Sequence, residues 1–144
     1  MSTQPSRTIE QVRATILPMP FATTMHLEIE SATDGVGVVS MPLSDSVSYD
    51  GAAFAAMAVG VVADVAAGAA TLSMLPPDQM TLTGRIDTTI TASTVGTRLT
   101  ARAELRERDD TTLIFDAVAT VQGPDGKTTN CGTAVITMRV PRAS

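Results

Sequence analysis

The sequence has no tryptophan, one tyrosine and three phenylalanines in 144 residues. A chain this poor in aromatic rings cannot build the stacking platforms that bind single-stranded nucleic acids. Positive charge is also scarce, because 10 Lys and Arg against 15 Asp and Glu give a formal net charge of −5. Phosphate backbones need a basic surface, so we expect no nucleic-acid partner.

Cysteine and histidine each occur once, as Cys131 and His26. A single cysteine forms no internal disulfide, which suits a reducing compartment. A single histidine excludes His-rich metal sites and disfavours serine–histidine or cysteine–histidine catalysis. We therefore expect no metal, an exposed structural His26 on a strand, and a small core residue at Cys131.

The sequence predicts neither a signal peptide nor a membrane-spanning segment. The N-terminus lacks the basic start and apolar core of a signal peptide, so we expect a cytoplasmic protein. Residues 51–77 are apolar and carry a single charge, Asp64. Alanine inserts weakly into bilayers and a central aspartate opposes insertion, so this run predicts a buried helix.

The length and the 44% hydrophobic content are typical of one domain. We expect a lead helix and linker over residues 1–20 and a single domain over 21–144. Apolar residues at helical spacing predict the lead helix: Ile9, Val12, Ile16 and Leu17. Pro18 and Pro20 are expected to end it.

The long alanine-rich run predicts one central helix from about Ala53 to Met74, ended by Pro76 and Pro77. Such a helix would be about 33 Å long, enough to cross a small domain. Small residues on nearly every face would let a sheet approach it closely all round.

Alternating apolar and polar residues predict six strands. An N-terminal hairpin turns at Asp34-Gly35, with a strand over 25–30 and its return over 36–43. After residue 77 we predict a four-strand meander. Its first three strands cover about 80–90, 98–106 and 113–121, and the last follows the turn at Pro124-Asp125-Gly126 and ends near Val140. The fold class is therefore α+β, with a six-stranded antiparallel sheet wrapped around one long helix and a short N-terminal helix.

Asp64 is the residue that needs a chemical explanation, because it is the only charge between Asp50 and Asp78. Its helical neighbours, from Gly60 to Gly68, cannot pair with it. A buried carboxylate with a raised pKa beside a cavity can act as a general base. The alternative is a structural aspartate bonded to backbone or to an arginine of another strand. The residue chemistry alone leaves both open.

The segment from Tyr49 to Pro77, above all ADVAAGAA and then LPP, resembles the helix of PaaI-like and 4-hydroxybenzoyl-CoA-type hot-dog thioesterases. The stretch GRIDTTI stands in place of the family's apolar-Asn-aromatic strand, and the pattern covers about residues 22–140. The resemblance implies a hot-dog fold and a homodimer or homotetramer with the acyl-CoA site at the dimer interface. It implies hydrolysis of an acyl-CoA thioester to a carboxylic acid and free CoA, with Asp64 as general base or nucleophile.

The chain departs from the family's motif at the helix start. Aligned from Asp64, the family's His-Gly-Gly falls on Ala55, Ala56 and Met57, and its Asn falls on Tyr49. The backbone N–H of Ala56 can still polarise the thioester carbonyl, while the side-chain roles of the His and Asn are lost. The chain is thus either an active hydrolase or a hot-dog module that binds acyl-CoA without hydrolysing it.

Further contacts are expected around these residues. The substrate is expected to meet a set of mostly small side chains: Tyr49, Met57, Gly60, Val61, Ala67 and Gly68. Arg98 and Arg102 either contact CoA phosphates or form a solvated face paired with Glu104 and Asp116. No cofactor is expected beyond the CoA of the substrate, and the shortage of aromatics favours an aliphatic or small acyl group.

Overall fold

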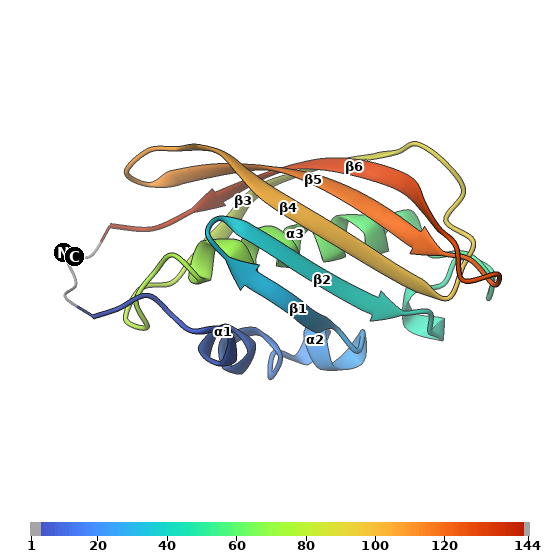
Figure 1. The fold of residues 1–144 in the computed structure, drawn as a ribbon, viewed down its shortest axis with the longest axis horizontal. Helices are drawn as coiled ribbons and strands as arrows, with labels where there is room; N and C mark the ends of the chain where they lie inside the picture. The colour runs from blue at the N-terminus through green and yellow to red at the C-terminus, as the bar shows by residue number, and fades with distance from the viewer. Residues whose placement is uncertain (1–3, 143–144) are drawn as a thin grey trace.

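The computed structural model describes residues 4–142. Three α-helices, one 3-10 turn and six strands follow one another along the chain: α1 (Ile9–Ile16), α2 (Pro20–Thr24), β1 (Glu28–Thr33), β2 (Val36–Pro42), η1 (Asp45–Val47), α3 (Ala56–Leu72), β3 (Leu82–Ile90), β4 (Arg98–Arg108), β5 (Thr112–Gln122) and β6 (Thr128–Arg139). The predicted fold class is confirmed: one six-stranded antiparallel sheet curves around α3, with α1 and α2 on the open side (Figure 1).

The central helix is shorter than predicted, with bounds of Ala56–Leu72 in place of about Ala53 to Met74. At its start the Asp50 carboxylate accepts hydrogen bonds from the N–H groups of Ala52 and Ala53, at 2.9 and 2.8 Å. This turn holds the chain off the helical path despite the alanines. At its end, Leu75 N–H bonds the Leu72 carbonyl, so the last turn tightens before the prolines. Between residues 4 and 142, no helix combines the length and apolar character needed to span a bilayer.

The sheet approaches α3 most closely at Gly37 of β2. A Cβ atom on Gly37 would lie 2.1 Å from the Ala66 carbonyl oxygen, so only glycine fits there. Ala66 is itself completely buried. Backbone thus packs directly on backbone, which requires small residues on both elements.

The strands do not form the predicted four-strand meander, because their order is β1-β2-β4-β5-β6-β3. β3 pairs with β6, β4 pairs with β2, and the segment between β3 and β4 crosses the start of α3. Phe54 N–H donates to the Thr94 carbonyl and Gly96 N–H donates to the Ala52 carbonyl, at 3.0 and 3.2 Å. A Cβ on Gly96 would lie 2.4 Å from the Gln122 carbonyl oxygen, so this crossing also needs a glycine.

The N-terminal region holds a second helix that the sequence did not predict. Pro20 does not end a helix but begins α2, since proline suits the first helical position. β1 therefore starts at Glu28, and His26 lies in the preceding turn with φ 55°, exposed to solvent rather than on a strand. The hairpin at Asp34-Gly35 is confirmed, with φ of 51° and 76° at its two central residues.

β3 is an edge strand with an unusual amount of exposed apolar surface. Leu82, Ile86 and Ile90 are all exposed along it. Its pairing with β6 shifts register between Thr83 and Arg85, which marks a bulge at Gly84. A long apolar edge with unpaired backbone groups is a surface on which another strand can pair.

Arg7 fastens the N-terminal segment to the loop that follows α3. Its side chain is 6% exposed and donates hydrogen bonds to the carbonyls of Pro76, Pro77 and Gln79, at 3.1, 3.2 and 2.7 Å. Its backbone N–H also bonds the Leu75 carbonyl at 3.0 Å. One guanidinium therefore satisfies several carbonyls that the prolines leave without helical partners.

Replacement of Arg7 tests this anchor. Arg7→Met keeps an apolar stem but removes every side-chain donor, so we expect a loss of about 2–3 kcal/mol in the free energy of unfolding. Urea unfolding followed by circular dichroism measures it. Arg142→Met is the matched control, because its ion pair with Asp110 is long and exposed. Equal stabilities for the two variants would contradict the anchoring role.

Candidate functional site

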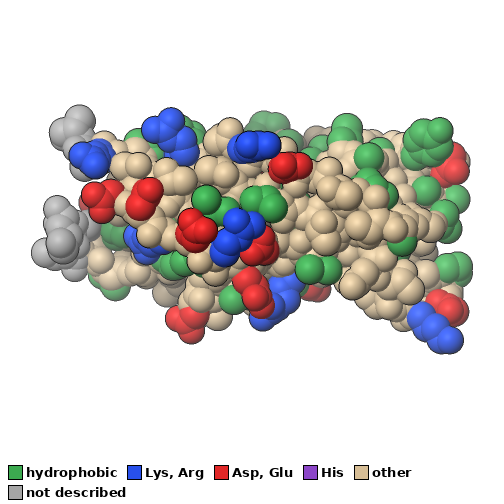
Figure 2. All heavy atoms as spheres, turned by 90° about the horizontal axis from the view of Figure 1, so that it is seen from above, with side chains coloured by type: hydrophobic (Ala, Val, Ile, Leu, Met, Phe, Trp, Pro, Cys, Tyr) green, Lys and Arg blue, Asp and Glu red, His purple; other side chains and the backbone are tan. Residues whose placement is uncertain are grey.

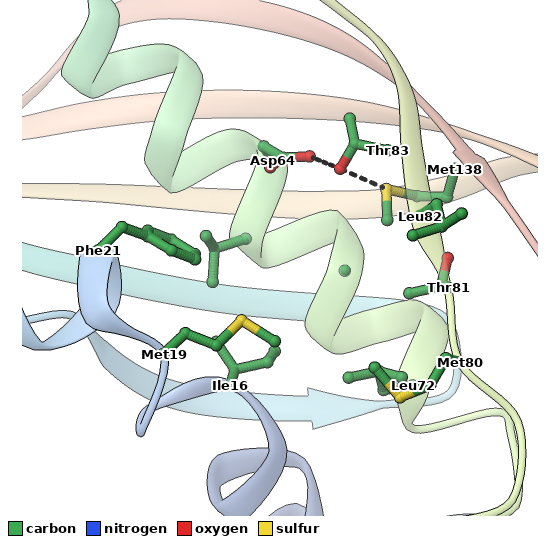
Figure 3. A pocket seen from close by; sticks show the side chains of 12 residues that line it. Ile16, Met19, Phe21, Asp64, Leu72, Met80, Thr81, Leu82, Thr83 and Met138 are labelled. Carbon is green, nitrogen blue, oxygen red and sulfur yellow. Dashed lines mark hydrogen bonds between the residues drawn. The ribbon is translucent and has the colours of Figure 1, made fainter.

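Asp64 lies in the middle of α3 and points toward β3 (Figure 3). Its carboxylate accepts a hydrogen bond of 2.6 Å from the hydroxyl of Thr83. Burial raises the pKa of Asp64 above its ordinary value, and the Thr83 hydrogen bond offsets part of that rise. Among the described residues, Asp64 bonds neither a backbone group nor an arginine, which were the two partners expected of a structural aspartate.

A cavity of about 250 Å³ opens beside Asp64. Its floor is α3, one wall comes from the N-terminal helices, and the other comes from β3 and the segment before it (Figure 3). The lining side chains are mostly apolar: Ile16, Met19, Phe21, Val65, Gly68, Leu72, Met80, Leu82 and Met138, with Asp64, Thr81 and Thr83. A charged group with a raised pKa at the side of an apolar cavity is a candidate reaction centre.

The first turn of α3 carries free hydrogen-bond donors. Ala56 is the first helical residue, and the Ala52 carbonyl is occupied by Gly96 N–H. Within residues 4–142 neither Ala56 N–H nor Met57 N–H donates to another group, whereas Ala58 N–H bonds the Ala55 carbonyl at 2.9 Å. The Ala56 N–H is therefore free to meet a ligand, and its predicted role at a thioester carbonyl stays a prediction. Two such N–H groups at a helix N-terminus attract negative charge.

A second apolar groove, of about 460 Å³, lies along this first half of α3. The predicted contact residues Met57, Gly60 and Val61 line it together with Ala56 and with Ile86, Thr88 and Ile90 of β3. The Thr88 hydroxyl oxygen is buried and has no hydrogen-bond partner among the described residues. It lies 3.2 Å from where a Cβ on Gly60 would stand. A buried hydroxyl without a partner is a group that a ligand can satisfy.

Asp64 and the free N–H of Ala56 do not meet within one chain. Asp64 is eight helical steps beyond Ala56, which corresponds to about 12 Å along the axis. A general base and an oxyanion donor that act on one carbonyl must both lie within hydrogen-bond reach of the reacting groups. The two features therefore serve the same reaction only if a second copy of the chain supplies one of them.

Of the three remaining predicted contact residues, one lines the cavity and two do not. Gly68 lines the cavity beside Asp64. Ala67 is completely buried in the core and lines neither space. Tyr49 is 80% exposed in the loop before α3 and also lines neither space. The structure thus gives Ala67 and Tyr49 no place at the site within one chain.

Arg98 and Arg102 lie on the outer face of β4, because their neighbours Leu99 and Ala101 face the core. Arg98 pairs with Glu28 and also donates to the Ser40 hydroxyl, at 2.9 Å. Arg102 pairs with Glu104. Acidic and basic side chains lie beside one another over this side of the sheet (Figure 2). A contact with CoA phosphates stays a prediction, and within one chain the sheet stands between these arginines and Asp64.

The remaining candidates contribute no second site. Cys131 is completely buried, and burial raises the pKa of its thiol. Across the described residues, no three His, Cys, Asp or Glu side chains lie close enough together to hold a metal ion.

Two parts of the site could not be found from the sequence pattern. Thr83 and Ile86 both face α3, although their odd spacing places them on opposite faces of a regular strand. The bulge at Gly84 restores them to one face. The cavity wall formed by α1 and α2 depends on tertiary packing. The only sign of this wall in the sequence is the apolar character of Ile16, Met19 and Phe21.

Comparison with known proteins gives matches at the level of structure. No protein-family model and no curated protein sequence matches the chain. A thioesterase family protein of Silicibacter pomeroyi is 23% identical with a TM-score of 0.84, over 93% of this chain and 98% of its own. A thioesterase of Haemophilus influenzae is 13% identical with a TM-score of 0.79, over 99% and 96% of the two chains.

A third solved structure, the PaaI protein from the phenylacetic acid degradation operon of E. coli, is 15% identical with a TM-score of 0.76 over 94% of each chain. These similarities extend over nearly the whole of every chain compared, and they agree with the curved sheet around one central helix. The chain therefore has the hot-dog fold of these thioesterase structures.

Proposed function

We propose that the protein hydrolyses an acyl-CoA thioester to a carboxylic acid and free CoA, with Asp64 as the catalytic carboxylate. The observation that carries the proposal is the position of Asp64: a carboxylate with a raised pKa beside an apolar cavity, held by Thr83. The thioesterases that share the fold support the reaction class. One fold can host many functions, so we assign the reaction from the chemistry of the site.

In the proposed reaction, the ionised Asp64 takes a proton from a water molecule. The water oxygen attacks the thioester carbonyl carbon, and the carbonyl oxygen becomes negatively charged in the tetrahedral intermediate. Free N–H groups in the first turn of α3 stabilise that charge. The carbon–sulfur bond then breaks, and the CoA thiolate receives the proton from Asp64. Direct attack by the carboxylate on the carbonyl carbon, followed by hydrolysis of the anhydride, is the alternative.

A two-fold dimer through the free edge of β3 would bring the two halves of this site together. The residue midway between Ala56 and Asp64 is Gly60, and its nearest contacts on β3 are Thr88 and Ile86, the latter at the centre of the strand. If two β3 strands pair antiparallel about Ile86, the two-fold axis passes beside Gly60. Asp64 of one copy then lies level with Ala56 of the other. The exposed apolar side chains of β3 support this edge as the interface.

Asp64→Asn tests the catalytic carboxylate. Loss of the proton acceptor should lower kcat by about 10²- to 10⁴-fold, measured as free-thiol release from a panel of acyl-CoAs. A buried acid with a raised pKa stabilises the fold fully only below its unfolded pKa, and that contribution is lost as pH rises through the folded pKa. At neutral pH the neutral Asn removes this penalty, so the melting temperature should equal or exceed that of the wild type. A variant that melts far below wild type would make Asp64 a structural residue.

Thr83→Val tests how Asp64 is tuned. The reaction needs the ionised carboxylate, so kcat/KM should fall as pH is lowered through the raised pKa of Asp64. Without the hydroxyl, which lowers that pKa, the acidic limb of the pH profile should move to higher pH. Thr83→Ser keeps the donor and should restore the wild-type profile. Identical acidic limbs for Val and wild type would exclude Thr83 as a positioning residue.

Ala56→Pro tests the backbone donor. Proline removes the N–H but suits the first helical position, and Ala55 already has the extended conformation (ψ 148°) that a following proline needs. Loss of one oxyanion donor should lower kcat by about 10²- to 10³-fold with the helix intact. Ala56→Gly keeps the N–H and serves as the matched control.

Mixing the two inactive variants tests the shared site. In a dimer of Asp64→Asn with Ala56→Pro, one of the two sites combines an intact Asp64 with an intact N–H. Random exchange of subunits should therefore recover about one quarter of the wild-type activity. No recovery, or a monomer by sedimentation at micromolar concentration, would contradict a site built from two copies.

A further inference from the structure

The cavity beside Asp64 has the chemistry of an alkyl-chain site. Apart from Asp64, the polar groups that line it are two threonine hydroxyls, Thr81 and Thr83. Its deep side is formed by Leu72 and Ile16, which are 2% and 6% exposed. The single aromatic ring is that of Phe21, which is exposed at the rim. Nothing in this lining offers a ring a stacking partner from both sides or a polar substituent a hydrogen bond at depth.

Gly68 keeps this cavity open. A Cβ at this position would meet only the Met138 terminal methyl, at 3.7 Å, which is ordinary contact distance. The fold would therefore accept alanine, which stabilises the interior of a helix better than glycine does. Close packing does not require this glycine, in contrast to Gly37. The missing side chain leaves space on the helix face one turn beyond Asp64.

The length of the cavity along α3 indicates the length of chain that fits. Asp64 lies at one end of the cavity and Leu72 with Met80 at the other (Figure 3). Eight helical residues span about 12 Å, and an extended alkyl chain of bonds near 1.5 Å advances roughly 1.3 Å per bond, so about nine bonds fit.

The N-terminal wall of the cavity is fixed rather than hinged. Arg7 ties the chain before α1 to the loop after α3, through the carbonyls of Pro76 to Gln79. Arg13 ties α1 to β1, since its guanidinium donates to the Ile29 carbonyl at 3.0 and 2.8 Å. Arg7 also lies 3.5 Å from the sulfur of Met80 at the far end. A wall held at both ends sets a definite limit on chain length.

We propose that this cavity binds a linear, saturated acyl chain of medium length, about eight carbons, and that Gly68 and Met80 set its limit. The proposal rests on the proposed function, because it takes Asp64 to lie at the thioester end of the chain. It assigns the substrate class as medium-chain aliphatic acyl thioesters, in preference to aromatic ones.

The test uses S-alkyl-CoA thioethers of 2 to 16 carbons, which bind without being hydrolysed, with the 144-residue protein in a calorimeter. The affinity should rise roughly fourfold per methylene up to about eight carbons and then level off or fall. S-octyl-CoA should bind more tightly than S-(2-phenylethyl)-CoA. An affinity that climbs unbroken to sixteen carbons, or a preference for the phenylethyl compound, would overturn the assignment.

Two substitutions test where the acyl chain lies in the cavity. Gly68→Leu places a side chain about 6 Å along the helix from Asp64, so the preferred chain should shorten to about four carbons. Met80→Ala removes the far-end side chain and should lengthen the preferred chain. Met74→Ala is the matched control, because Met74 follows the same helix but packs near Gly35, outside the cavity, and should not shift the preferred length. Thermal melting of each variant checks the fold, and Gly68→Leu should melt no lower than the wild type.

The outcomes separate the two proposals. Tight binding of S-octyl-CoA without thiol release from octanoyl-CoA would refute the hydrolase and leave the chain site standing. Thiol release with a chain-length preference that Gly68→Leu does not change would leave the hydrolase standing and refute this chain site. Absence of both binding and thiol release would refute both.

Discussion

The contact of the Gly37 backbone with the Ala66 carbonyl is the constraint on which the rest of the molecule depends. Strands can approach a helix this closely only where neither element carries a large side chain at the contact. The same requirement explains why α3 is built from alanine, valine and glycine, and why it can contact all six strands. A helix of small residues also leaves unfilled space wherever the sheet is absent. The gap between the edges β1 and β3 is such a place: the cavity beside Asp64 and the groove beside Gly60 both lie along it.

Much of this fold follows from local rules. The alanine run and Pro76 predicted the buried helix, and Asp34-Gly35 predicted the first hairpin, because each signal acts over a few residues. The order of the strands could not be predicted from local rules. The path from β3 to β4 depends on contacts with the loop before α3, and hydrophobic periodicity gives no sign of such contacts. Pro20 was misread for a related reason: proline ends one helix and begins another, and only the packing of α2 decides between them.

The residues of the site also differ in how far the sequence predicts them. Asp64 stands out in the sequence because one charge among small apolar residues needs a reason. The free N–H at Ala56 was predictable from the turn chemistry of Asp50. Thr83 was not, because the bulge at Gly84 changes which face of β3 its hydroxyl reaches. The separation of about 12 Å between Asp64 and Ala56 did follow from the predicted helix and its rise per residue.

The bare position at Gly68 has a consequence for how this protein changes over evolutionary time. Glycine in a helix interior costs about 1 kcal/mol relative to alanine, and here the surroundings would accept the larger residue. Selection for stability alone would therefore replace it, and each replacement would narrow the space beside Asp64. If the proposed acyl chain occupies that space, selection for its binding would retain the glycine. In related chains, the identity of this one residue should report whether they still use the same ligand.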